Sequence, residues 1–231
     1  MNDHDASGPM VVPCRPGRRV AGQDPVKREQ ILDGAKRVFT RLGFDAASMN
    51  DITREANVSK GTIYVYFANK EELFEALIER ERHRIFSDTA LAFSGDGSVG
   101  EKLERYGKVL VGLICSDGVI KAQRTVIAIS DRMPEMAKRF YDRGPQKGKN
   151  NLVAFLNTEI AAGTLIIGDV DLAAYQFTDL CMAGLFRRRI FGHMSEPPTE
   201  ADIDRSVSAA VRMFLCYYGS GKDRDMPGEK R

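Results

Sequence analysis

Residues 48–73 constrain the fold more than any other stretch, because they hold three helix boundaries in close succession. Ser48 can accept the backbone N–H groups that the first turn of a short helix leaves free. Asn57 then suits a sharp turn, because asparagine tolerates the left-handed backbone conformation. Ser59 can cap a second short helix, which we expect over 60–66. The stretch therefore predicts two short helices joined by a tight turn, which is the geometry of a helix-turn-helix.

The second short helix has an apolar side and a polar side. Ile63 and Phe67 lie four residues apart and share a face, so we expect both to be buried. In a helix-turn-helix that binds DNA, the second helix enters the major groove. The side chains left to point in other directions are Lys60, Thr62, Tyr64 and Tyr66.

The same stretch resembles the DNA-binding signature of the tetracycline-repressor (TetR/AcrR) family of bacterial transcriptional regulators. The resemblance rests on residues 52–67, which read ITREANVSKGTIYVYF, and on KEEL at 70–73. Val-Ser-x-Gly, Tyr-x-Tyr-Phe and Lys-Glu-x-Leu stand there at fixed spacing, so the match is far more specific than a lone glycine-rich motif. Asn57 stands where the family usually has glycine, and Thr53 where it usually has alanine. Both substitutes fit a turn and a helix face.

The resemblance implies an all-α fold, with an N-terminal three-helix helix-turn-helix DNA-binding domain joined to a larger helical ligand-binding and dimerisation domain. It also implies a sequence-specific regulator, expected to be a homodimeric repressor that a small-molecule effector releases from its operator. Such a dimer would read a pseudo-palindrome in double-stranded DNA, with half-sites about one turn (~34 Å) apart or somewhat more. An architectural DNA-binding protein without a ligand is the alternative, although the large helical body exceeds what DNA anchoring requires.

The resemblance also implies which residues contact DNA. Outer residues of the second helix would read base edges, and the missing side chain of Gly61 would let the backbone come close to the duplex. Residues at helix ends resemble the family's phosphate contacts, which set the register of the protein on DNA. The expected base contacts are Lys60, Thr62 and Tyr64, and the expected phosphate contacts are Ser48, Tyr66 and Lys70.

We expect four parts along the chain: a flexible arm at 1–24, the DNA-binding domain at 25–70, the effector-binding and dimerisation domain at 71–218, and a disordered tail at 219–231. The arm and the start of the first helix are cationic, so they could follow the minor groove or meet phosphate. A disordered leader is the alternative for the arm. The basic residues are Arg15, Arg18, Arg19, Lys27 and Arg28, against the single acid Asp24.

Apolar periodicity predicts helices along the rest of the chain. The first is expected from Val26 to Leu42, where Gly43 supplies a stop, and Phe44 should complete the small core of the DNA-binding domain. The β-branched segment 164–167 is expected to be a loop, because an isolated strand would lack a partner. The other expected helices run from the cap Asn69 to about Ala92, over 99–115, over 117–130, over 134–162 with a break at Gly144-Pro145, from the cap Asp171 to about Phe191, and onward from Thr199.

The resemblance implies that the helical body binds an effector, and its apolar character suggests an apolar or aromatic one. An aromatic or methionine side chain at helical spacing can equally be plain core. The last two helices would form a four-helix interface with a second subunit, unless they only pack within one chain, and Arg187, Arg188 and Arg189 could be solvated or lie at the dimer rim. The residues nominated for the effector are Tyr106, Met136, Phe140, Phe177, Met182 and Phe186.

Composition narrows the function further. Of the 231 residues, 43% are hydrophobic and 29% charged, and no apolar run reaches the roughly 18 residues of a membrane helix. The polar, acidic N-terminus is not an export signal, which favours a cytoplasmic address.

The spacing of the four cysteines, Cys14, Cys115, Cys181 and Cys216, predicts buried or incidental thiols rather than a zinc site, with redox sensing as the alternative. His4, His83 and His193 accompany no nucleophile or phosphate loop, so we expect neither an enzyme nor a cofactor.

Overall fold

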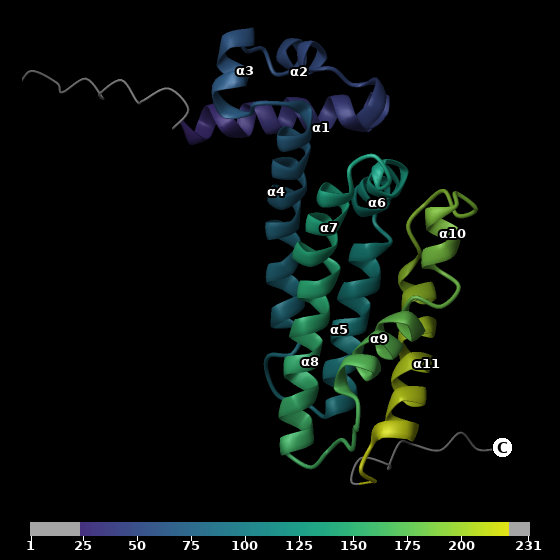
Figure 1. Cartoon of the computed structure of the whole chain (residues 1–231). Helices are drawn as coiled ribbons and strands as arrows, with labels where there is room; N and C mark the ends of the chain where they lie inside the picture. Colours follow the sequence, from purple (N-terminus) through teal and green to yellow (C-terminus); the bar gives the residue numbers. More distant parts are fainter. Residues whose placement is uncertain (1–23, 222–231) are drawn as a thin grey trace, which may run out of the picture.

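The computed structural model describes residues 24–221, and for residues 82–91 it describes the backbone alone. Within this range the chain is helical, as predicted. Figure 1 shows an N-terminal unit, α1 to α3, lying across one end of a longer bundle, with α4 running from one into the other. The helices are α1 (Pro25–Ala46), α2 (Met49–Glu55), α3 (Lys60–Tyr66), α4 (Lys70–Leu91), α5 (Val99–Ile114), α6 (Asp117–Ile129), α7 (Pro134–Arg143), α8 (Pro145–Ala161), α9 (Val170–Cys181), α10 (Phe186–Ile190) and α11 (Glu200–Tyr218).

Local signals explain how the N-terminal unit folds. Ser48 and Ser59 cap α2 and α3, each accepting a backbone N–H three residues further on. Between the two helices Asn57 adopts a φ of 51°, the left-handed conformation that the turn requires. Gly34 lets α1 and α2 approach closely, because a Cβ at this position would lie 2.6 Å from the Cβ of Ala56. The predicted helix-turn-helix is therefore confirmed.

The end of α1 differs from the prediction. The helix changes direction at Gly43, whose φ of 77° and ψ of 172° are not helical, so glycine interrupts it as expected. The prediction that Phe44 completes the core of the N-terminal unit is wrong, because the bend carries its ring onto Phe74 of α4, with ring centroids 5.0 Å apart. There it belongs to a joint cluster that connects α1, α4, α6 and α7. The joint cluster consists of Phe44, Phe74, Val126, Ile129 and Met136.

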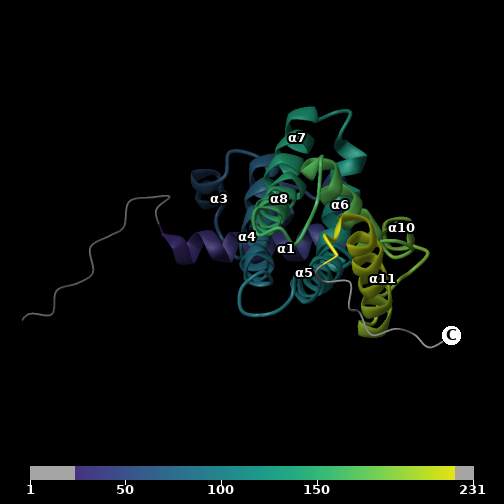
Figure 2. The same cartoon turned by 90° about the horizontal axis from the view of Figure 1, so that it is seen from below.

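Helix α4 ties the N-terminal unit to the body, α5 to α11. Near its start Leu73 and Leu77 are buried in the core of the N-terminal unit. One turn later Arg80 donates hydrogen bonds to Asp33 (2.8 Å) and Glu29 (3.1 Å) on α1. Seen from below, α4 lies between α5 and α8 (Figure 2). A shift of α4 relative to the body would therefore also move α1.

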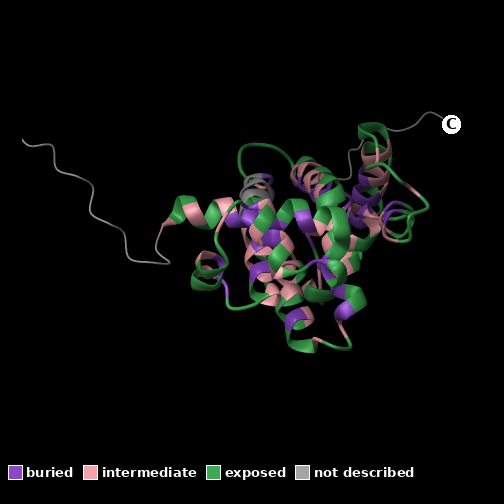
Figure 3. Ribbon diagram, turned by 90° about the horizontal axis from the view of Figure 1, so that it is seen from above, coloured by how far each residue is buried: buried purple, intermediate pink, exposed green. Residues whose placement is uncertain are grey.

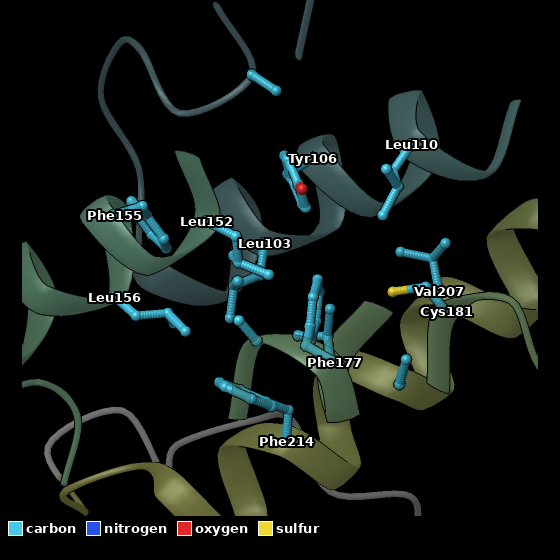
Figure 4. Close-up of a cluster of buried hydrophobic side chains, with 14 of the residues drawn as sticks. Leu103, Tyr106, Leu110, Leu152, Phe155, Leu156, Phe177, Cys181, Val207 and Phe214 are labelled. Carbon is cyan, nitrogen blue, oxygen red and sulfur yellow. The ribbon is translucent and has the colours of Figure 1, made fainter. Parts of the chain in front are cut away.

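The body has one large apolar core between α5, α8, α9 and α11, and Figure 4 shows side chains from all four helices meeting there. Tyr106 and Phe177 are 1% and 0% exposed. Gly107 allows α5 and α11 to pack closely, since a Cβ there would lie 2.7 Å from Cγ1 of Val207. Figure 3 shows the resulting pattern, with buried positions where helices meet and exposed positions around the outside. No described helix is both long and apolar enough to cross a membrane.

The predicted continuous helix to Phe191 is wrong. Asp169, rather than Asp171, caps α9 by accepting the N–H of Leu172 at 2.9 Å. After α9 the chain passes through Gly184 at a φ of 74°, a conformation that cannot continue a right-handed helix. The short helix α10 follows in a separate direction. The break predicted at Gly144-Pro145 is confirmed, because α7 ends at Arg143 and α8 begins at Pro145.

Arg189 of α10 is a buried structural residue, 2% exposed, rather than a solvated or dimer-rim arginine. It donates to the carbonyl oxygens of Cys115 (3.0 Å) and Met194 (2.9 Å) and to the carboxylate of Asp117 (2.6 Å). These bonds fasten the loop after α10 onto the turn between α5 and α6. An arginine can serve several acceptors at once because its guanidinium carries five N–H donors.

The C-terminal end of the described chain is paired with the loop at 164–167. Leu165 pairs with Gly219 in an isolated β-bridge, and the N–H of Ser220 donates to the carbonyl oxygen of Thr164 at 3.0 Å. The segment 164–167 is thus a loop, as predicted, whereas Gly219 and Ser220, which the sequence placed in the tail, are paired with it. The expectations for the basic arm and the distal tail lie outside the described residues, and so do those for Arg15, Arg18, Arg19, Cys14, His4 and the side chain of His83.

Candidate DNA-binding surface

Helix α3 lies at the end of the molecule away from the body (Figure 1). Ile63 and Phe67, 0% and 2% exposed, fix its inner side in the core of the N-terminal unit, as predicted. Its outer side exposes Lys60, Gly61 and Tyr64. Among the described side chains none forms an ion pair with Lys60, so its ammonium group is available to an acceptor. An added Cβ at Gly61 would meet no atom closer than 3.9 Å, which leaves the backbone open to a close approach.

Two further residues of α3 complete this outer side. Thr62 is half-buried, and its hydroxyl lies 2.7 Å from the hydroxyl of Ser59, so local hydrogen bonding already fixes its position. Val65 is 52% exposed and was not predicted as a contact residue. Its apolar side chain carries no polar signal that could have marked it, yet an exposed apolar side chain in the major groove can contact a thymine methyl group.

Tyr66 connects the end of α3 to the start of α1. Its hydroxyl oxygen accepts the backbone N–H of Asp24 at 3.2 Å. The hydroxyl hydrogen can still be donated, for example to a phosphate oxygen. Tyr66 thus holds the two helix ends together and keeps the donor that its expected role requires.

Ser48 is occupied by helix capping. Its hydroxyl accepts the N–H of Asp51 at 3.1 Å, and the carboxylate of Asp51 accepts the N–H of Ser48 at 3.2 Å. The hydrogen bonds from Ser48 hold the pKa of Asp51 below its ordinary value. A phosphate contact here would share the start of α2 with this carboxylate.

Lys70, expected to contact phosphate, points into the protein. Its ammonium group donates to the carbonyl oxygens of Phe44 (2.7 Å), Ala47 (2.9 Å) and Asp45 (3.3 Å). It also lies 4.5 Å from the centroid of the Phe44 ring. These three acceptors match the three N–H donors of a lysine, so the side chain caps the end of α1.

Several arginines of the N-terminal unit are neutralised by acids. Glu55 pairs with Arg37 (2.7 Å) and Arg41 (3.2 Å), and these hydrogen bonds lower the pKa of its carboxyl group. Arg28 lies over the ring of Phe67, 5.4 Å from the centroid, and its guanidinium is also 4.0 Å from the carboxylate of Glu29. Lys60 of α3, by contrast, is exposed and has no ion pair among the described residues.

Two family profiles match the regions whose geometry has just been described. Residues 31–77 match the profile described as bacterial regulatory proteins of the tetR family. Residues 101–220, more than half of the chain, match the profile described as AefR-like transcriptional repressor, C-terminal domain. This chain belongs to the TetR family of transcriptional regulators. Both profiles describe regulators rather than enzymes, in agreement with the prediction.

The relatives of this TetR-family chain match its sequence over different lengths. The uncharacterised regulator YvkB of Bacillus subtilis is 27% identical over 190 residues, which cover 80% of this chain and 95% of YvkB. YfiR of the same organism is 42% identical, but over 53 residues that cover 23% of this chain and only 26% of YfiR. The solved structure of the flavonoid-responsive regulator FrrA has a TM-score of 0.70 at 28% identity, covering 85% of this chain and 98% of FrrA.

The residues nominated for the effector fall into two separate groups. Met136 and Phe140 belong to the joint cluster or pack against it. With Val126, Ile78 and charged side chains they line a hollow of about 20 Å³, room for roughly one water molecule. The other four nominated residues belong to the core of the body or pack against it; they are Tyr106, Phe177, Met182 and Phe186.

The sequence did not point to Phe93, which follows Ala92, the residue that caps the end of α4. Its ring stacks on Tyr106 and on Phe155, with ring centroids 4.5 and 4.2 Å apart. Phe93 lies in a glycine-rich segment that composition identifies as a loop, and no periodic pattern marks it as a core residue. Its contacts make it the residue that joins the end of α4 to the core of the body.

Proposed function

We propose that this chain is a homodimeric transcriptional repressor whose two α3 helices bind a pseudo-palindromic operator, and which a small aromatic effector releases from DNA. The observation that carries the proposal is the outer side of α3. There Lys60, Gly61 and Tyr64 are exposed on a helix whose opposite side is buried. A short, rigidly seated helix with a polar outer side is what major-groove recognition requires.

Base recognition and phosphate contacts are assigned to different residues. We assign base edges to Lys60, Thr62 and Tyr64, and phosphate contacts to Ser48 and Tyr66. Lys70 would act mainly by holding the end of α1, because its donors already serve three carbonyl oxygens.

A dimer is supported by the exposed apolar side chains of α9 and α11. On α11, Met213 and Tyr217 are 58% and 81% exposed and lie four residues apart, so they share a face. On α9, Leu172 is 50% exposed. One helix-turn-helix gives modest affinity, whereas two linked half-site contacts strengthen binding through their effective concentration.

An aromatic effector is supported by the aromatic core of the body and by the likeness to FrrA, a related protein described as flavonoid-responsive. Effector binding would act through α4, because this helix shares a core with α1 and is bonded to it through Arg80. The profile matched by residues 101–220 is described as that of a repressor, which supports repression over activation.

The test is selection of genomic fragments by the purified protein, followed by fluorescence anisotropy of the best fragment over a series of salt concentrations. Enrichment of one pseudo-palindrome is expected, and genes beside it would indicate effector classes to try. Salt-sensitive binding without a preferred sequence would favour the architectural alternative. Binding of an operator by a monomer would contradict the dimeric arrangement.

A further inference from the structure

The ring of Phe93 fills a slot between two other aromatic rings. It lies nearly parallel to Tyr106 of α5, at an interplanar angle of 19°, and to Phe155 of α8, at 12°. Tyr106 and Phe155 are 1% and 8% exposed, whereas Phe93 is half-buried. Figure 4 shows Tyr106 and Phe155 on different helices at the top of the core. The two walls are therefore fixed by the bundle, and the ring between them comes from the loop after α4.

Among the described side chains, Arg105 holds the segment that carries Phe93. Arg105 of α5 donates to the carbonyl oxygens of Ala92 and Ser94, on either side of Phe93, at the long distances of 3.3 and 3.4 Å. Beyond Ser94, Gly95 adopts a φ of 84° with open space around it. A glycine at such a position is a suitable pivot for withdrawing the ring.

We infer that this slot is a binding site for a planar aromatic molecule of one or two fused rings, and that Phe93 is the internal group which such a ligand displaces. The slot already holds a benzyl group, so its shape and chemistry suit a flat apolar ring. Within the described part of the chain, the hydroxyl of Tyr106 makes one long bond, 3.4 Å, to the carbonyl oxygen of Gly148. It is thus able to donate to a polar atom on the ligand.

Displacement of Phe93 frees the end of α4. Ala92 caps this helix and Phe93 is the next residue, so the ring in the slot anchors α4 to α5 and α8. With the anchor withdrawn, α4 can shift and carry α1 with it. This coupling rests on the proposed function, since it supplies the step from effector binding to release of DNA, whereas occupation of the slot is independent of DNA.

Indole is a suitable probe, because the chain has no tryptophan and indole emission can be excited where tyrosine absorbs little. Indole is expected to bind the wild-type protein, and Phe93→Ala should tighten binding about tenfold or more, because it removes the competing ring. Adding Phe155→Ala to Phe93→Ala should remove most of this gain. Phe191→Ala, at a residue 85% exposed, is the matched control and should bind as the wild type does.

Hydrogen exchange on the wild-type protein separates a binding site from a cavity created by mutation. Saturating indole should speed exchange of the helical amides at 89–91, because the ring that anchors the end of α4 leaves the slot. Equal indole affinity of wild type and Phe93→Ala, or unchanged exchange at 89–91, would overturn the inference. Neither measurement uses DNA. Failure to bind any operator would therefore overturn the proposed function and leave the slot established or refuted by its own data.

Discussion

The ammonium group of Lys70 lies 2.7 Å from the carbonyl oxygen of Phe44 and 2.9 Å from that of Ala47. These carbonyls belong to the end of α1, where the bend at Gly43 leaves them without helical partners. The first residue of α4 thus closes the last turn of α1. A cation at the C-terminal end of a helix also opposes the helix dipole favourably.

Replacing Lys70 by alanine should lower the free energy of unfolding by about 1–2 kcal/mol, because three carbonyl oxygens lose their donor at a partly exposed site. Urea denaturation measures the change, and Lys70→Gln should recover part of the loss by restoring one donor. Unchanged stability combined with equally weakened binding to all DNA sequences would instead return Lys70 to the phosphate contact that the motif suggests.

Lys60→Ala and Tyr64→Ala should each reduce the free energy of operator binding by about 1–3 kcal/mol and relax the preference for bases at one position of each half-site. Helix content should stay the same, since both side chains are exposed. Anisotropy with the selected operator and its single-base variants makes the comparison. Lys121→Ala, which removes an exposed lysine from α6, is the control, and an equal loss of affinity there would refute the assignment.

Arg189→Leu should destabilise the protein by about 2–4 kcal/mol, since it leaves the carbonyl oxygens of Cys115 and Met194 and the carboxylate of Asp117 without their donor. Arg188→Leu is the matched control, because Arg188 is exposed one residue away. Denaturant midpoints of both variants should therefore differ clearly. Similar midpoints would show that the buried guanidinium contributes little.

Helix caps and the turn of the helix-turn-helix could be predicted because their causes are local. Ser48 and Ser59 accept donors three residues away, and Asn57 takes the left-handed conformation within its own residue. A sequence contains all the atoms of such an interaction within one short window. The same reason explains why the break between α7 and α8 was readable from Gly144-Pro145.

Contacts between distant segments could not be predicted in the same way. Arg187, Arg188 and Arg189 are identical in sequence terms, and only the position of the turn at Cys115 selects the third for burial. Lys70 likewise matches a phosphate-contact motif in the sequence. In the fold, the bend at Gly43 places carbonyl oxygens of the end of α1 within reach of its ammonium group. The helix break near Gly184 could not be predicted, because a single glycine in an apolar helical pattern is often tolerated.

The thiol of Cys181 makes stability depend on pH in the alkaline range. Burial raises its pKa from the ordinary value of 9.0 to about 12 in the folded protein. The stability that the un-ionised Cys181 thiol contributes is fully present below pH 9.0. It is lost as the pH rises from there toward about 12, because the thiol of the unfolded chain ionises first. The free energy of unfolding should therefore fall more steeply with pH for the wild type than for Cys181→Ala. Parallel curves from urea titrations would contradict this prediction.

The exposed side of α11 provides the test of dimerisation. In a two-fold interface both subunits contribute the same surface patch, so one substitution is present twice in the interface. Tyr217→Glu places two like charges in a desolvated interface and should give the mass of a monomer in sedimentation equilibrium at micromolar concentration. Affinity for the full operator should then fall on the order of 100-fold, while binding to a single half-site is retained. Ile127→Glu, at an exposed site on α6, is the control and should remain dimeric. If Tyr217→Glu stays dimeric and binds the operator as tightly as the wild type does, the interface lies away from α11.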